Sequence, residues 1–359
     1  MSGLLDLLRP DLRDFTGYAS ARRATVSGSI WLNANESPQP SLADQGQSLN
    51  RYPEPQPKLL RERMAQLYGV RPEQLMITRG SDEGIDLLVR GFCRAGLDAV
   101  LIAPPCFGMY AVCARVQNAP LVEVPLVEQG GAWTLDVPAV IDAVQHRNVR
   151  VVFLCSPANP TGQALSLDQV RSLAQALRGR AILVLDEAYV EYSSIESASS
   201  LLDEFPQLVV LRTLSKAHAL AGARIGALLG DPELVAVLRN LSAPYPVPAP
   251  SALLALSALS DQGIAQSALR CREAVVERKA LETALAAIAG VATVYPSEGN
   301  FLLVRFDDAQ QAFERLLAAG VVVRDVRAMP QLQDALRISI GTPAENAQLL
   351  AALKQGAVA

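Results

Sequence analysis

Histidine and closely spaced cysteines are scarce in this chain of 359 residues, which limits the sites that it can build. The two histidines are His146 and His218, and the five cysteines include no CxxC pair. This set argues against a metal site of the zinc type, and a serine–histidine–aspartate triad would have only two candidate bases. An odd number of dispersed cysteines is typical of buried, reduced thiols, so we expect a cytoplasmic protein.

Long apolar runs and an excess of positive charge are also absent. Apolar stretches such as 181–185 and 253–259 are far shorter than the roughly 20 residues that cross a bilayer, so no membrane span is expected. The net charge of -4 argues against a surface for nucleic acid or anionic lipid. Acidic residues and arginines alternate near the N-terminus, which is unlike a secretory signal.

Half of the residues are hydrophobic, and their pattern predicts an α/β fold. Seven short apolar runs read as strands: 75–78, 99–103, 121–124, 151–154, 181–185, 208–211 and 225–229. Helical patterns separate most of them, for example 58–68, 80–94, 136–146 and 166–177, the last capped by Ser166. Fully apolar strands that alternate with helices favour a mostly parallel seven-stranded sheet between helices.

The chain divides into three parts. Residues 1–35 are expected to form an arm that packs on the small domain or on a partner subunit, with a short strand near 31–38. Residues 36–245 form the large domain and contain a proline-rich connection at 37–57. Residues 246–359 form a smaller α+β domain, with a long helix over 263–289, strands near 291–295, 300–306, 321–325 and 336–340, and helices over 309–319 and from 343.

Unusual polar motifs follow the strands of the predicted sheet. They are Gly80-Ser81, Pro105-Cys106-Phe107, Ser156–Gly162, Asp186–Tyr189 and Thr213–Lys216. In a parallel α/β sheet, ligands bind at the carboxyl ends of the strands. We therefore expect these motifs to meet in one site.

Lys216 is the candidate nucleophile of this site. It follows an apolar strand and lies in a segment rich in alanine and glycine, where a weakly solvated amine is easily neutralised. Thr213, Ser215 and Arg224 are able to hold a phosphate beside it. A nucleophilic lysine next to a phosphate site indicates a Schiff base with pyridoxal 5′-phosphate.

Asp186 ends the buried strand 181–185, where a carboxylate needs a cation or a hydrogen-bond donor. A protonated pyridine nitrogen is one such partner, and a helix cap or a magnesium ion are the alternatives. The sequence has no GxxxxGK[ST] motif, so a nucleotide-hydrolysing site lacks an essential part. Asn159 and Tyr189 are placed to donate to a phenolate oxygen, although a plain turn also explains Asn159.

Other residues have both a functional and a structural interpretation. Ser81 and Asp82 begin a helix, whose free N–H groups attract anions or are simply capped. Phe107 stacks on a cofactor ring or packs in the core. Arg324 and Arg337 lie in or at the end of apolar strands and bind a substrate anion or form salt bridges.

The complete set resembles the fold-type I pyridoxal-phosphate-dependent aminotransferases. SPANPTG, LDEAY and SKAHALAGARIG are general to that fold. WLNANESP, NRYPEPQP, TRGSDEGIDLLVR, PPCFGMY, RTLSKA, APYPVP and LRISIGT resemble the histidinol-phosphate aminotransferase subfamily, and together they cover essentially the whole chain.

The resemblance implies a role for each matching residue. Lys216 would bind the cofactor and move the substrate proton, Asp186 would pair with the pyridine nitrogen, and Phe107 would stack on the ring. Ser81, Asp82, Thr213, Ser215 and Arg224 would hold the phosphate, together with Tyr52 from the other subunit of a homodimer. Tyr18, Asn159, Arg324 and Arg337 would face the substrate.

The implied reaction is amino transfer from L-histidinol phosphate to 2-oxoglutarate, which gives imidazole-acetol phosphate and L-glutamate. A lyase similar to threonine-phosphate decarboxylase and a broader aromatic amino-acid transaminase are the alternatives. The segment before Trp31 is short for the DNA-binding domain of a regulator with this fold. His218 stands where an aromatic residue is usual, so we expect it to influence substrate preference.

Overall fold

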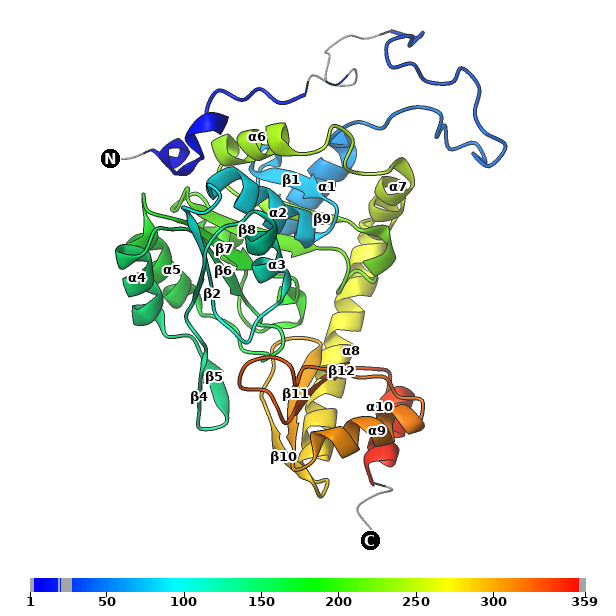
Figure 1. Ribbon diagram of the computed structural model, residues 1–359. Helices are drawn as coiled ribbons and strands as arrows, with labels where there is room; N and C mark the ends of the chain where they lie inside the picture. The colour runs from blue at the N-terminus through cyan, green and yellow to red at the C-terminus, as the bar shows by residue number, and fades with distance from the viewer. Residues whose placement is uncertain (1–2, 19, 21–27, 355–359) are drawn as a thin grey trace.

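The computed structural model describes residues 3–18, 20 and 28–354, which form two domains joined by one long helix (Figure 1). The α-helices are α1 (Lys58–Tyr68), α2 (Ser81–Phe92), α3 (Met109–Val116), α4 (Val137–His146), α5 (Leu167–Leu177), α6 (Pro232–Leu241), α7 (Ala249–Ala258), α8 (Asp261–Ala286), α9 (Ala309–Ala318) and α10 (Pro343–Lys354). The strands are β1 (Leu75–Thr78), β2 (Ala99–Ile102), β3 (Leu121–Glu123), β4 (Val127–Gln129), β5 (Ala132–Thr134), β6 (Val149–Cys155), β7 (Ile182–Asp186), β8 (Leu208–Thr213), β9 (Gly226–Leu229), β10 (Val291–Val294), β11 (Phe301–Phe306), β12 (Arg324–Asp325) and β13 (Ala335–Ser339).

The large domain is built on a seven-stranded sheet in the order β1-β9-β8-β7-β6-β2-β3. The pairs β3–β2, β2–β6, β6–β7 and β7–β8 are parallel, whereas β9 runs antiparallel to both β8 and β1. The predicted mostly parallel sheet is confirmed. The carboxyl ends of β2, β6, β7 and β8 consequently lie along one edge, where the polar motifs begin.

Successive residues of each central strand enter different cores because side chains alternate across a sheet. Leu183 and Leu185 of β7 pack with α1, α4 and α5 on one face, and Ile182 and Val184 pack with α2, α3 and α6 on the other. This two-sided burial explains why the strands read as continuous apolar runs. It also fixes the sheet as a rigid platform for the residues at its edge.

The helix α5 has the predicted cap. The Ser166 hydroxyl accepts a hydrogen bond from the Gln169 backbone N–H at 3.2 Å, and the Gln169 side chain accepts one from the Ser166 N–H at 3.0 Å. This reciprocal capping box satisfies two backbone donors that a helix start otherwise leaves free.

The small domain contains the antiparallel sheet β10-β11-β13-β12, with α9, α10 and the end of α8 packed around it. The hairpin β4–β5 of the large domain reaches toward this sheet (Figure 1). Its Glu128 pairs with Arg305 of β11 at 2.7 Å and accepts a hydrogen bond from Tyr295. The hairpin therefore connects the two domains.

The N-terminal arm differs from our prediction. The short helices η1 (Leu4–Leu7) and η2 (Pro10–Leu12) pack on the large domain of the same chain, where Leu7 and Leu8 join the core under α6. The Arg9 backbone N–H also donates to the Gly91 carbonyl at 3.0 Å. This part of the arm thus packs on the large domain of its own chain and not on the small domain, because its leucines cover an apolar patch there.

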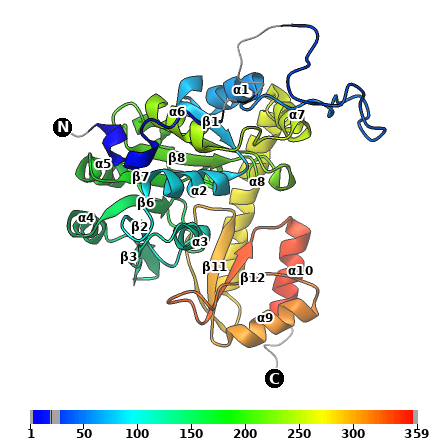
Figure 2. The same ribbon diagram turned by 45° about the horizontal axis from the view of Figure 1, so that its top comes forward.

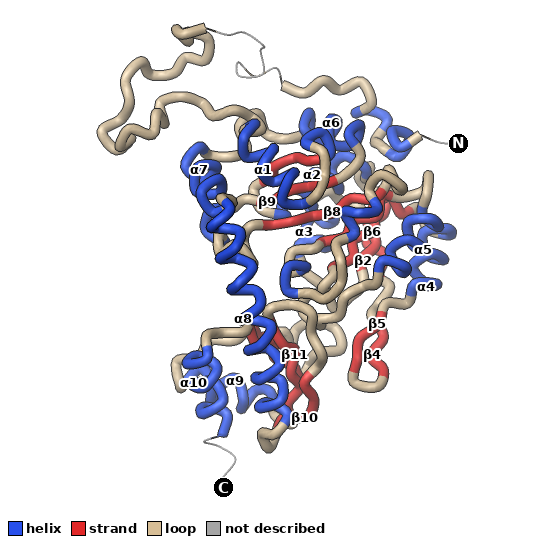
Figure 3. The backbone as a smooth tube through the Cα atoms, turned by 180° about the vertical axis from the view of Figure 1, so that it is seen from behind, coloured by secondary structure: helices blue, strands red, loops and turns tan. Residues whose placement is uncertain are grey.

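The segment before α1 also differs from expectation. Residues 31–38 were predicted to include a strand, but no strand forms between residue 28 and α1 (Figure 3). This segment runs away from the body of the large domain (Figure 2). Isolated from any sheet, its backbone has no neighbouring strand to pair with.

The sequence also missed α6, α7 and the β4–β5 hairpin. Ala252 and Ala255 of α7 lie in the core of the large domain, so the domain boundary predicted at 245/246 belongs one helix later, before α8. Among the described residues, no helix is long and apolar enough to cross a membrane. The same part of the chain holds no cluster of three or more histidine, cysteine, aspartate or glutamate side chains suited to a metal ion.

Candidate active site

A cavity of about 150 Å³ lies at the carboxyl edge of the large sheet. All the predicted cofactor residues except Tyr52 line it, namely Ser81, Asp82, Phe107, Asn159, Asp186, Tyr189, Thr213, Ser215, Lys216 and Arg224. The ends of β6, β7 and β8 and the start of α2 supply most of these side chains. The parallel arrangement thus brings together residues that are up to 143 positions apart, from Ser81 to Arg224.

Lys216 follows β8 by three positions, on a loop that the backbone bond from Leu214 N–H to the Ile225 carbonyl fixes at 3.0 Å. Its side chain remains accessible from the cavity, and its amine lies 5.7 Å from the centre of the Tyr189 ring. Desolvation by the surrounding protein lowers the pKa of Lys216, and the positive charge of Arg337 adds to this effect. A lowered pKa increases the fraction of neutral, nucleophilic amine.

Asp186 is the last residue of β7 and only 2% exposed. Its carboxylate accepts hydrogen bonds from the Tyr110 hydroxyl at 2.8 Å and from the Ala188 N–H at 3.2 Å. Burial raises the pKa of Asp186 to about 6, although both hydrogen bonds oppose the shift. The site therefore holds a desolvated carboxylate that a cationic ring nitrogen would stabilise.

Tyr110 is a functional residue that sequence reasoning missed. Its ring is fully buried between Phe153, stacked at 4.9 Å, and Phe107, edge-on at 5.6 Å. A buried tyrosine hydroxyl needs a partner, and here the partner is Asp186. Tyr110 lies in the quoted PPCFGMY motif, but the spacing gave no sign that its hydroxyl points at β7.

Asn159 joins the two domains inside the site. Its amide N–H donates to the Tyr189 hydroxyl at 3.3 Å, and its carbonyl oxygen accepts a hydrogen bond from Arg337 of β13. The Arg337 guanidinium is half-buried and lies 5.4 Å from the Phe301 ring centre. Burial lowers the pKa of Arg337, so an anionic ligand is needed to offset its desolvation.

The remaining polar residues form an anion cup. The Thr213 hydroxyl donates to the Ser215 hydroxyl at 3.0 Å, and Arg224 contacts Ser215 at 3.4 Å and Asp82 at 2.9 Å. Gly80 precedes α2 with φ of +73°, and a Cβ there would lie 2.5 Å from the Arg224 Nη2 atom. The glycine allows the guanidinium to lie against the free N–H groups of the helix start.

Four predicted residues do not line this cavity: Arg337, which reaches it only through its bond to Asn159, and Tyr18, Tyr52 and Arg324. Tyr18 is 66% exposed, and Tyr52 is 50% exposed and stacks on Tyr245 at 4.4 Å. Arg324 is exposed on β12, where it pairs across the strand with Arg337. Their assignments to substrate and to the partner's cofactor stay predictions.

His218 is placed differently from our expectation. It is 6% exposed and lines a separate pocket beside α8, not the cavity that contains Lys216. The backbone turns between the two residues, so their side chains leave the loop on different sides. The suggested influence of His218 on substrate preference therefore has no direct contact to act through.

Comparisons with known proteins also indicate an aminotransferase. The sequence model of the family "Aminotransferase class I and II" matches residues 20–353. The histidinol-phosphate aminotransferase of Xanthomonas campestris pv. campestris (strain 8004) is 57% identical over 99% of this chain and 98% of its own length. That of Stenotrophomonas maltophilia (strain R551-3) is 59% identical over 98% of this chain and 96% of its own length. The chain belongs to the class I and II aminotransferases. Within them it belongs with the histidinol-phosphate aminotransferases.

Solved structures of an aminotransferase and of a decarboxylase share the fold of this chain. The histidinol-phosphate aminotransferase from Sinorhizobium meliloti, in complex with pyridoxal-5′-phosphate, has a TM-score of 0.76 and 27% identity, with 85% of this chain and 82% of that chain covered. The L-threonine-O-3-phosphate decarboxylase from Porphyromonas gingivalis has a TM-score of 0.72 and 25% identity, with 86% and 90% covered.

The cavity of this aminotransferase fits pyridoxal phosphate. The amine of Lys216, the buried carboxylate of Asp186 and the cup around Arg224 match an aldehyde, a pyridine nitrogen and a phosphate. Phe107 supplies an aromatic face between them. These side chains therefore provide a partner for the aldehyde, the pyridine nitrogen and the phosphate of that cofactor.

The pKa of Asp186 makes the stability of the cofactor-free protein depend on pH. The folded pKa of about 6 lies above the ordinary aspartate pKa of 3.8, so the folded state binds the proton more tightly than the unfolded chain. This contribution to stability is complete below pH 3.8 and is lost as pH rises through 6. We expect the free energy of unfolding, relative to that of Asp186→Asn, to fall by roughly 2 kcal/mol between pH 4 and pH 7. Urea titrations of both proteins at several pH values measure these free energies of unfolding. A difference between the two proteins that does not change with pH would contradict the prediction.

Proposed function

We propose that the chain uses pyridoxal 5′-phosphate to transfer the amino group of L-histidinol phosphate to 2-oxoglutarate, giving imidazole-acetol phosphate and L-glutamate. The observation that carries this proposal is the cavity in which the Lys216 amine, the buried Asp186 carboxylate and the Arg337-bound Asn159 meet. The close relatives named for this activity support the choice of substrate. We also place the reaction in the cytoplasm, in line with five free cysteines in the described residues.

The bound cofactor supplies an electron sink for the bond broken at the substrate α-carbon. Lys216 would accept the proton that leaves the substrate α-carbon and would then donate it to the cofactor. Its lowered pKa suits that role, since a proton-transfer group works best near the ambient pH. Asp186 would hold a protonated ring nitrogen through its negative charge, and Asn159 and Tyr189, which are hydrogen-bonded to each other, would supply donors to the phenolate oxygen.

Arg324 and Arg337 form the proposed substrate fork. They are direct partners across β12 and β13, and such partners project from the same face of a sheet. Two like charges on one face repel each other, so a bound phosphate or carboxylate stabilises the pair. We assign them the phosphate of histidinol phosphate and the α-carboxylate of glutamate, with Tyr18 as a further substrate contact.

Arg337→Ala is expected to raise the KM for 2-oxoglutarate by roughly 10- to 100-fold, because a hydrogen-bonded charge pair is lost. Arg337→Lys keeps the charge but not the planar fork, so we expect an intermediate value. Steady-state kinetics with both substrates measure the effect. An unchanged KM in both variants would remove Arg337 from the substrate site.

A homodimer with shared active sites completes the proposal, and Tyr52 is the residue that we assign to the partner's cofactor phosphate. Its exposure and its place on the segment that leaves the large domain support this assignment. Mixing inactive Lys216→Ala and Tyr52→Ala chains is expected to restore about a quarter of wild-type activity, because half of the dimers then hold one intact site. Unfolding and refolding the mixture, followed by an activity assay, tests this. No recovery would show that Tyr52 serves its own chain.

The lyase remains the second candidate because the decarboxylase from Porphyromonas gingivalis shares this fold and its name includes a phosphorylated amino acid. Product analysis separates the two reactions. We expect glutamate from L-histidinol phosphate and 2-oxoglutarate, and no carbon dioxide from L-threonine phosphate. L-Phenylalanine in place of histidinol phosphate tests the broader aromatic transaminase, and faster turnover of phenylalanine would favour that alternative.

A further inference from the structure

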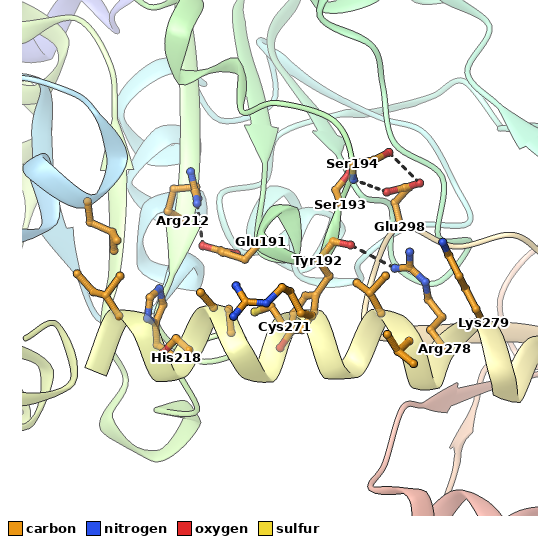
Figure 4. A pocket seen from close by; sticks show the side chains of 18 residues that line it. Glu191, Tyr192, Ser193, Ser194, Arg212, His218, Cys271, Arg278, Lys279 and Glu298 are labelled. Atoms are coloured by element: carbon orange, nitrogen blue, oxygen red, sulfur yellow. Dashed lines mark hydrogen bonds and ion pairs between the residues drawn. The ribbon is translucent and has the colours of Figure 1, made fainter. Parts of the chain in front are cut away.

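A second, larger pocket lies on the other side of the Lys216 loop. Its volume is about 870 Å³, within the range of roughly 300–1,000 Å³ that is common for small-molecule sites. One wall is the helix α8, and the other is formed by η4 (Val190–Tyr192) and by Ala217 and His218 (Figure 4). None of the proposed catalytic or cofactor residues lines it.

One end of this pocket is cationic. Arg278 is only 5% exposed and donates to the carbonyls of Gly299 at 2.7 Å and Tyr192 at 3.4 Å, but it forms no ion pair within the described residues. Lys279 lies at the same end, and Arg272 lines the pocket next to Cys271 along α8; neither has an ion pair in that part of the chain. The nearby Glu298 is bonded to Ser194, at 2.6 Å from its N–H. These three cations therefore have unused capacity for an anion.

The floor of the pocket is apolar. Ala268, Cys271 and Val275 lie at helical spacing along α8, and Cys271 packs with Tyr192 and Ala217. Figure 4 shows Cys271 between the cationic end and the end that holds His218. A flat, weakly polar body fits between such ends better than a compact inorganic ion.

The far end holds buried polar atoms without partners. Neither ring nitrogen of His218 has a hydrogen bond, even though the residue is buried and only 6% exposed. The Arg212 Nε atom and the Glu191 Oε2 atom beside it are also unpaired, even though these two residues bond each other at 2.7 Å through other atoms. Each such group costs about 1–3 kcal/mol while unsatisfied. Donors and acceptors of this kind suit a heteroaromatic ring.

We propose that this pocket is a second ligand site, for a phosphorylated heteroaromatic compound of about the size of a nucleoside monophosphate. The phosphate lies beside Arg278 and Lys279, the body covers Cys271 and Arg272, and the ring meets His218. Because His218 follows Lys216 by two positions, the occupant contacts the loop that carries the reactive amine. This inference does not depend on which amino donor the catalytic site accepts.

Calorimetric titration of the full-length protein with adenosine monophosphate tests the proposal. The protein is first loaded with pyridoxal phosphate and then freed of the excess by gel filtration, and 2-oxoglutarate is added to saturation, so that the catalytic cavity is occupied while the second pocket stays open to the nucleotide. We expect one molecule bound per chain with a Kd below about 1 mM, and weaker binding of both inorganic phosphate and adenosine. Two results would overturn the proposal: no saturable binding of the nucleotide up to about 10 mM, or inorganic phosphate that binds as tightly as the nucleotide. A Kd of 10 mM is about the weakest affinity that a built site of this size would show.

Two variants and one control locate the bound nucleotide. Arg272→Ala with Lys279→Ala removes two exposed cations and is expected to weaken nucleotide binding by at least about 10-fold. His218→Phe keeps an aromatic side chain buried at this position and is expected to weaken the binding of the nucleotide but not that of inorganic phosphate. Arg115→Ala with Lys354→Ala removes the same charge elsewhere and is expected to leave the Kd unchanged. If this control lost as much affinity for the nucleotide, net charge alone would explain the effect, and the proposed site would be excluded.

Discussion

Lys216→Ala is expected to lower the kcat for amino transfer by at least about 10³-fold, because a positioned proton-transfer group contributes about 10²- to 10⁴-fold. The variant also loses the amine that binds the cofactor covalently. The lysine is accessible from the cavity and makes no hydrogen bond through its amine in the described structure, so its removal leaves no buried partner unsatisfied. Activity should therefore fall while folding is preserved.

Two measurements separate this outcome from simple unfolding. Glutamate formation is followed over hours to capture slow turnover, and the Tm of the variant is compared with that of the parent. We expect Lys216→Arg to be as inactive as the alanine variant, because its guanidinium stays protonated at neutral pH. Substantial activity in either variant would mean that another group moves the substrate proton.

Asp186→Asn is expected to have the second-largest effect. The loss of one charge from a preorganised site commonly lowers kcat by about 10²- to 10³-fold. Asparagine keeps an acceptor for the Tyr110 hydroxyl, which bonds Asp186 at 2.8 Å, so the packing around α3 is retained. Only the charge opposite the proposed ring nitrogen disappears.

The same substitution is expected to stabilise the cofactor-free protein at neutral pH, because it removes a buried carboxylate whose pKa is raised to about 6. A variant that is more stable and less active indicates that Asp186 serves function at the expense of folding. Kinetics and thermal unfolding on the same preparations measure both effects. An active Asp186→Asn protein would refute the proposed role of the carboxylate.

The sequence predicted the site well where one topological rule applied. Asn159 and Lys216 follow strands of the parallel part of the sheet and Asp186 ends one, and such strand ends meet at one edge whatever the details of packing. The buried strands were readable because both faces of the sheet are covered, which leaves uninterrupted apolar runs such as β7.

The contacts that depend on packing were not predictable. The hydrogen bond from Tyr110 to Asp186 requires the position of α3 over the sheet, which periodicity does not give. The pocket beside α8 depends on how far that helix stands from η4. The helix α8 has no single apolar stripe, because its two ends pack against different domains, so nothing in the sequence indicated that His218 faces this helix.

The fate of the amino nitrogen tests the central claim most directly. L-Histidinol phosphate labelled with ¹⁵N in its amino group is incubated with 2-oxoglutarate, the protein and pyridoxal phosphate, and the products are analysed by mass spectrometry. Direct transfer predicts one labelled L-glutamate for each imidazole-acetol phosphate formed, and no label in ammonia. Label released as ammonia, or product formed without labelled glutamate, would contradict amino transfer at Lys216.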